Sequence, residues 1–276
     1  MNKPPRRIVV AYGSNLNFED LAKIADIHID TKSVHRGILF GYRLAFTRWS
    51  KNRQGGVLDI VQAKNSAVPV IIFSVDWKDY PKLASKEGVS SGCYKETELC
   101  LWDMDSREFC SAIGFQVVKP EFYVEPSSDY VGIVREGYRR FGFPETVLDA
   151  AVDNKPFPMS EFFQWLLRGG AIGPSLQHGG VFTPREDWGG EHFVIETMPR
   201  DPQDREDIAY IQRNREECRR LVDFMYFMKQ FAYTENDPMR YRYVIGMLGE
   251  TCHEYANASY AVLCEKLIAR AVELLK

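Results

Sequence analysis

The chain is 276 residues long, which is enough for one large hydrophobic core or two modest ones. Its content of 45% hydrophobic and 26% charged residues is ordinary for a soluble globular protein. The formal net charge of −3 lacks the basic excess of proteins that bind nucleic acids or membrane surfaces, so we expect neither partner.

The N-terminal part of the chain is predicted to be rich in strands. A β-branched run over Ile8–Ala11 forms the first, and Asn17–Ala25 then shows the apolar spacing of a helix that Asn15 or Asn17 would cap. Alternation and turn residues predict further strands over Gly37–Trp49, Gly55–Ala63, Pro69–Trp77, Cys93–Met104 and Glu108–Val118, with a short helix over Asp79–Gly88. Many strands and few helices favour a small, mostly antiparallel barrel or curled sheet.

The pattern becomes helical after Pro126. Helices are predicted from Ser127 or Ser128 to Gly142 and over Pro144–Asn154, with a linker at 155–160 and a short helix at 161–170. A loop region rich in glycine and proline follows over 171–204, and the chain from Arg205 onward is predicted to be helical, including 237–256 and 259–275. We therefore expect a first domain over residues 1–153 and a loop-rich, then helical, extension over 154–276.

Cysteine and histidine spacing favours neither disulfides nor a metal site. The six cysteines show no CxxC pair, so we expect reduced thiols in a cytoplasmic protein. The N-terminus lacks the long apolar run of a signal peptide, and no segment reaches the length of a membrane span. The five histidines are scattered, and the sequence HEYAN at 253–257 lacks the second histidine of a zinc-binding HExxH.

The turn YGSN at 12–15 joins the first strand to the first helix. It lacks the glycines and lysine of the common phosphate-binding loops, and Ser14 lacks the second glycine of a GxSxG nucleophile elbow. Ser14 is therefore interpreted as a structural residue. The backbone N–H groups of such a turn can hold an anion, but the same pattern also fits a simple corner between strand and helix. The pattern alone leaves both interpretations open.

Glu87 lies in SKEGVSSGCY, where a short helix stops and the next strand begins. Its small and apolar neighbours suit a partly desolvated carboxylate that transfers protons. An ordinary exposed glutamate near a helix C-terminus fits the composition at least as well.

The order of the motifs YGSN, GYRLAF, GGVLDIV, PVIIFSVDW and LASKEGVSSGCY resembles the γ-glutamylcyclotransferase family, also called AIG2-like. The resemblance covers about the first 150 residues. Family members pair a Y-G-[ST]-x turn with a downstream catalytic glutamate, a glycine and a tyrosine, and a further tyrosine of the closing segment reaches the ligand. The matching residues here are Tyr12, Gly13, Ser14, Asn15, Glu87, Gly88, Tyr94 and Tyr130.

The resemblance implies an α+β fold, a small curled mixed β-barrel with flanking helices. It also implies a lyase or acyltransferase reaction in which the α-amine of a γ-glutamyl compound attacks its own γ-carbonyl, giving 5-oxoproline and a free amine. Glu87 would act as general acid and base, without metal or cofactor. The N–H groups from Gly13 to Leu16 would hold the substrate's charged oxygens, and Tyr12, Tyr94 and Tyr130 would line the site.

The resemblance leaves the substrate open among glutathione, γ-glutamyl amino acids and γ-glutamyl-lysine-type amines. A different class of function also stays open, because one fold can host many functions. In that alternative the domain is a non-catalytic binding or regulatory module, and its helical C-terminal half binds a protein partner or a second copy of the chain. In the loop at 171–204, His178, Arg185, Trp188 and His192 favour a structural connector over a specificity loop.

Overall fold

The computed structural model describes residues 6–106, 108–157, 159–168, 220–221, 224, 228, 238–255 and 258–274. These residues divide into two compact units, the first ending at Trp165 and the second beginning at Leu166. The domain boundary expected after residue 153 stays a prediction. The predicted loop at 171–204 and part of the helical stretch predicted after Arg205 lie outside the described residues.

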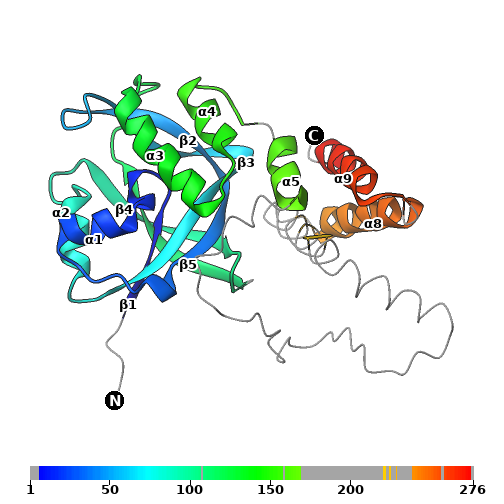
Figure 1. Cartoon of the computed structure of the whole chain (residues 1–276), viewed down its shortest axis with the longest axis horizontal. Coiled ribbons are helices and arrows are strands. Elements are labelled where there is room, and N and C mark those ends of the chain that lie inside the picture. Colours follow the sequence, from blue (N-terminus) through cyan, green and yellow to red (C-terminus); the bar gives the residue numbers. More distant parts are fainter. Residues whose placement is uncertain are drawn as a thin grey trace, which may run out of the picture. The chain divides into compact units, whose positions relative to one another are not determined.

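The first unit is built on a closed β-barrel of five strands (Figure 1). The strands are β1 (Arg6–Ala11), β2 (His35–Ser50), β3 (Gly55–Asp76), β4 (Tyr94–Asp103) and β5 (Glu108–Val117), and their order around the barrel is β1-β3-β2-β4-β5. The barrel is mixed, because β1 and β5 pair in parallel while the other neighbours are antiparallel. The predicted mixed barrel is confirmed.

The two strands predicted over 55–63 and 69–77 are wrong as separate elements, since both belong to β3. The polar residues between them form an irregularity in which 63–66 face the single residue Gly41 of β2. Gly41 has φ +74°, a conformation that favours glycine. Pro69 is accommodated because β1 pairs with β3 only from Ile71 onward, which leaves one edge of the strand open at the proline.

Short helices cover the barrel (Figure 1). They are η1 (Ser14–Leu16), α1 (Phe18–Ala25), η2 (Thr31–Ser33), α2 (Tyr80–Lys86), α3 (Ser128–Phe141) and α4 (Glu145–Val152). The next helix, α5 (Met159–Arg168), spans the boundary between the two units. Two of the predicted caps are present. The side chain of Asn17 accepts a hydrogen bond from the Asp20 N–H at the start of α1, and Ser127 accepts one from the Tyr130 N–H at the start of α3.

Glycines let the chain approach the barrel closely at the entry to α3. The Gly56 N–H donates to the Glu125 carbonyl oxygen at 2.8 Å, and a Cβ on Gly56 would lie 2.0 Å from the Val124 carbonyl oxygen. The preceding Gly55 is equally close to Ser127, with 2.5 Å from a Cβ to its backbone nitrogen. The glycine pair that the sequence marks as a strand start therefore also seats the segment that leads to Tyr130.

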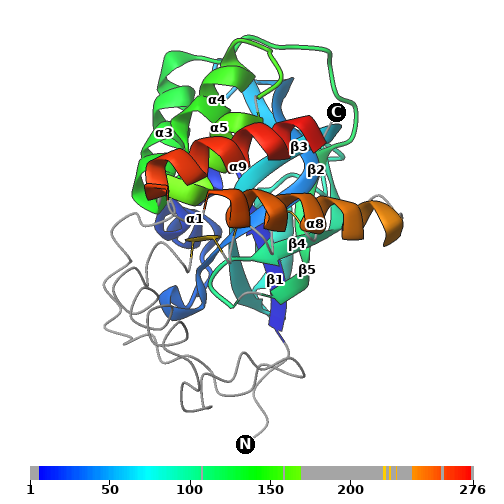
Figure 2. The same cartoon turned by 90° about the vertical axis from the view of Figure 1, so that its right-hand side faces the viewer.

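The second unit contains α8 (Pro238–Glu254) and α9 (Tyr260–Leu274), which lie against each other (Figure 2). Leu248 of α8 and Leu267 and Ala271 of α9 are fully buried. Both helices agree with the sequence prediction within a few residues. Among the described residues, none of the helices combines the length and apolar composition that crossing a membrane requires.

Candidate active site

A pocket of about 400 Å³, partly open to solvent, lies where β1 ends and η1 begins. The residues that line it are Val10, Ala11, Tyr12, Gly13, Ser14, Asn15, Leu58, Glu87, Tyr94, Phe115 and Tyr130. The structure thus brings together every residue predicted for the site except Leu16.

The turn at Gly13–Asn15 presents backbone N–H groups to the pocket. No hydrogen bond to another described residue is made by the N–H groups of Gly13, Ser14 and Asn15. The first N–H groups of a helical turn have no partner within it, so these donors are available to a ligand. The Leu16 N–H differs, because it donates to the Gly13 carbonyl oxygen at 2.9 Å, and the Leu16 side chain is fully buried. Leu16 therefore stabilises the turn through its backbone hydrogen bond and its buried side chain.

Glu87 lies at the C-terminal end of α2 and reaches the turn. The Asn15 side-chain amide donates to its Oε1 at 2.8 Å, and the Lys86 ammonium donates to the same oxygen at 2.9 Å. Lys86 also donates to Asn15 Oδ1 at 2.7 Å, which closes a three-membered polar cluster. Only 12% of the Glu87 side chain is exposed. The carboxylate is therefore held at the wall of the pocket, unlike an ordinary surface glutamate.

The backbone after Glu87 turns sharply so that the next strand starts inside the site. Gly88 has φ +80°, and its carbonyl oxygen accepts a hydrogen bond from the Cys93 N–H at 3.1 Å. Tyr94, the first residue of β4, then lines the pocket together with Glu87. The glycine that follows the glutamate thus places two pocket residues at once.

The three tyrosines of the pocket remain protonated at neutral pH. Burial, and after it the nearby Asp59 carboxylate, raises the pKa of Tyr12 well above its usual value. Burial also raises the pKa of Tyr94 and of Tyr130. The Tyr12 hydroxyl donates to the Phe115 carbonyl oxygen, whereas the Tyr130 hydroxyl accepts from the Leu58 N–H at 3.3 Å. Tyr130 is also hydrogen-bonded to the Ser14 side chain, which ties this tyrosine to the turn, while the proton of Tyr12 is used by Phe115.

Asp59 is a buried carboxylate beside the pocket that the sequence prediction missed. It is 2% exposed and accepts hydrogen bonds from the Thr47 hydroxyl at 3.0 Å, the Ile60 N–H at 2.9 Å and the Val117 N–H at 3.2 Å. Burial raises its pKa, and these hydrogen bonds oppose the rise. The available signal was a single acidic residue within the apolar run GGVLDIV.

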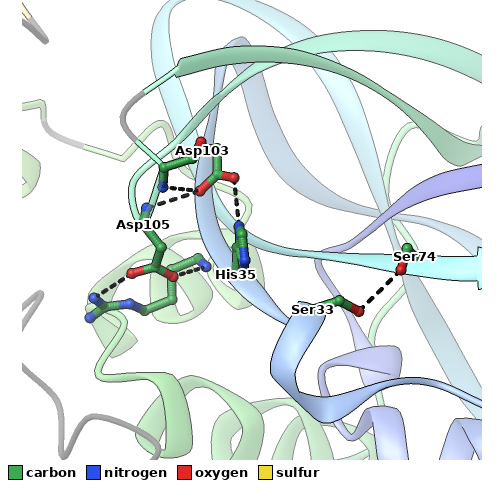
Figure 3. A network of polar contacts seen from close by, with 7 residues as sticks. Ser33, His35, Ser74, Asp103 and Asp105 are labelled. Atoms are coloured by element: carbon green, nitrogen blue, oxygen red, sulfur yellow. Dashed lines mark hydrogen bonds and ion pairs between the residues drawn. The ribbon is translucent and has the colours of Figure 1, made fainter. Parts of the chain in front are cut away.

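A second polar cluster lies at the seam between β2 and β4 (Figure 3). His35 Nδ1 is 2.7 Å from Asp103 Oδ2, and the other Asp103 oxygen accepts from the Asp105 and Ser106 N–H groups. Arg36 binds Asp105 through its guanidinium and its N–H. Since β2 and β4 share only two paired positions, these bonds help to close the barrel. Among the described residues, no group of three His, Cys, Asp or Glu could hold a metal ion.

Comparisons with known proteins find relatives among solved structures alone, since no family model and no curated protein matches the chain. A structure described as a gamma-glutamyl cyclotransferase is 21% identical, covering 51% of this chain and 82% of its own, with a TM-score of 0.46. An uncharacterized human protein is 23% identical, covering 50% and 82%, with a TM-score of 0.44. An AIG2-like mouse protein is 11% identical, covering 46% and 82%, with a TM-score of 0.34. The identities are low, and each match covers about half of this chain.

Proposed function

We propose that the first unit converts a γ-glutamyl amine or amide into 5-oxoproline and releases the free amine. The observation that carries the proposal is the position of Glu87, which the Asn15 amide and the Lys86 ammonium hold at the wall of the pocket. A carboxylate there can serve a proton-transfer reaction of a bound ligand. The free N–H groups of the turn lie on the same pocket wall and supply donors for a charged or polarised oxygen.

The reaction needs no nucleophile from the protein. The α-nitrogen of the substrate forms a bond to its own γ-carbonyl carbon, and the bond from that carbon to the leaving nitrogen breaks. The α-ammonium loses two protons as it becomes the ring N–H, and the leaving nitrogen gains two as it becomes a free ammonium. Glu87 would accept protons from the first nitrogen and return them to the second, so that none is consumed overall. Ring closure within one bound molecule benefits from a high effective concentration.

The remaining pocket residues would hold the substrate in a folded shape. The N–H groups of Gly13, Ser14 and Asn15 suit the developing negative charge on the γ-oxygen or the α-carboxylate. Protonated Tyr94 and Tyr130 present hydroxyl groups and aromatic faces next to Glu87, on whose charge their pKa values also depend. Tyr12 forms a wall, since its hydroxyl proton is used by Phe115.

A panel of γ-glutamyl compounds and an assay for 5-oxoproline test the proposal. With the best substrate, Glu87→Gln is expected to lower kcat by a factor of about 100 or more, because general acid–base catalysis contributes that much. A glutamine oxygen can still accept from Asn15 and Lys86, so the variant should fold normally, as circular dichroism can check. Glu136→Gln, an exposed position on α3, is the matched control and should keep full activity.

Two results would contradict the proposal. Full activity of Glu87→Gln would show that another group moves the protons. No 5-oxoproline from any compound of the panel would instead favour a binding module that uses the same pocket without chemistry.

A further inference from the structure

The two carboxylate oxygens of Glu87 have different surroundings. Oε1 accepts two hydrogen bonds, from Lys86 Nζ at 2.9 Å and from Asn15 Nδ2 at 2.8 Å. No donor within the part of the chain that the structure describes is bonded to Oε2. Because Glu87 lines the pocket, Oε2 is the oxygen that is left for a ligand.

Lys86 also decides which end of the Asn15 amide faces Glu87. A side-chain amide has a donor end and an acceptor end, and the acceptor end of Asn15 receives the Lys86 ammonium at 2.7 Å. Among the described residues, Lys86 alone donates to that oxygen. Without Lys86 the amide could turn its oxygen toward the carboxylate, and the two oxygens would repel each other. Lys86 therefore keeps the Asn15 donor on Glu87.

The position of Glu87 in the fold makes a neighbouring cation valuable. Helix α2 ends at Lys86, and Glu87 is its C-terminal cap, where the negative end of the helix dipole disfavours a carboxylate and favours a cation. The Lys86 side chain is 26% exposed and that of Glu87 only 12%, so this pair is better shielded than the surface ion pairs that contribute little. Lys86 itself does not line the pocket, and it reaches a ligand through Asn15 and Glu87.

We propose that Lys86 is a positioning residue for the proton transfers, which fixes Glu87 through Oε1 so that Oε2 exchanges protons with the substrate. This inference rests on the proposed function of the same pocket. Lys86 neither binds the substrate nor exchanges protons with it in this arrangement. Its loss should therefore lower kcat and leave KM nearly unchanged.

The experiment measures kcat and KM for 5-oxoproline formation from the best γ-glutamyl compound of the panel. Lys86→Met removes the charge and the donors, and we expect kcat to fall by roughly tenfold or more with KM changed by less than about twofold, because a slightly misplaced catalytic group is costly. Lys86→Arg should recover most of kcat, since a guanidinium can donate to both oxygens. Lys82→Met is the matched control and should keep both constants, because Lys82 of the same helix binds Asp26 at 2.9 Å instead.

A double variant separates positioning of Glu87 from general support of the fold. If Lys86 acts through Glu87, Lys86→Met should have almost no further effect on kcat in the Glu87→Gln background. A merely structural role would lower kcat by the same factor in both backgrounds. Circular dichroism checks that each variant is folded.

Four outcomes would overturn the inference. Wild-type kcat in Lys86→Met would show that Glu87 needs no such partner, and a raised KM with unchanged kcat would show that Lys86 binds the substrate. Equal factors in the two backgrounds would show that Lys86 does not act through Glu87. If the wild-type protein gives no 5-oxoproline from any compound, the proposed function itself fails and this inference fails with it, a result that is seen before any variant is made.

Discussion

The contact between α3 and the turn of the pocket makes Gly137 a sensitive position. A Cβ on Gly137 would lie 2.5 Å from the Leu16 Cβ, which is 0.9 Å short of an ordinary contact of 3.4 Å. The clash is between atoms bonded directly to the backbone, so either α3 or η1 must move. We expect Gly137→Ala to lower the free energy of unfolding by about 1–3 kcal/mol, the usual cost of overpacking a core. The shift would also move Asn15 relative to Glu87 and lower kcat/KM by roughly tenfold or more.

Gly132 of the same helix is the matched control. Nothing lies within 4 Å of a Cβ at that position, so Gly132→Ala should be neutral or stabilising by up to about 1 kcal/mol, because alanine favours helix more than glycine. Urea unfolding followed by tryptophan fluorescence measures both variants, since the first unit holds four of the five tryptophans, namely Trp49, Trp77, Trp102 and Trp165. Equal unfolding free energies for the two variants would refute the packing argument.

Two further predictions concern the His35–Asp103 pair and the buried carboxylate of Asp59. The hydrogen bond that His35 donates to Asp103 raises the pKa of His35, so its contribution to stability is complete below about pH 6.5 and is lost as the pH rises through the raised value. The urea midpoint should fall from pH 6 to pH 9, and an unchanged slope in His35→Gln would contradict this. Asp59→Asn should lower the free energy of unfolding by about 2–3 kcal/mol, because an amide cannot accept from all three buried donors, whereas Thr47→Val removes one donor and should cost only about 1 kcal/mol. Equal losses for the two variants would show that the Asp59 network is not the cause.

Much of the fold could be predicted because local patterns and the order of motifs agree. The alternating strands, the caps at Asn17 and Ser127, and the left-handed Gly142 after α3 are all local features, and the structure has them where the sequence places them. The continuity of β3 could not be predicted in the same way. Pro69 reads locally as a break, and only the pairing of β2 and β1 along different parts of β3 shows why the strand tolerates it.

The residues of the candidate site also fall into those that the sequence predicts and those that it does not. The turn and Glu87 are far apart in sequence, and their pairing followed from a family resemblance, since neither motif alone indicates the other. Lys86 and Asp59 were missed because their importance depends on neighbours from other strands and helices. Lys86 reads as an ordinary helix-end lysine until its contacts with Asn15 and Glu87 are known.

One side of the pocket is positioned by backbone geometry and the other is formed by side chains, so substitutions on the two sides should have different effects on activity. The side with Glu87 is fixed by backbone features, namely the turn at Gly13, the end of α2 and the positive φ of Gly88. The other side includes the side chains of Leu58, Phe115 and Tyr130, which come from β3, β5 and α3. Substitutions on the first side should therefore alter kcat for every substrate, whereas substitutions on the second should mainly change which leaving group is preferred. Separate measurement of kcat and KM with several γ-glutamyl compounds that differ in the leaving amine distinguishes the two effects.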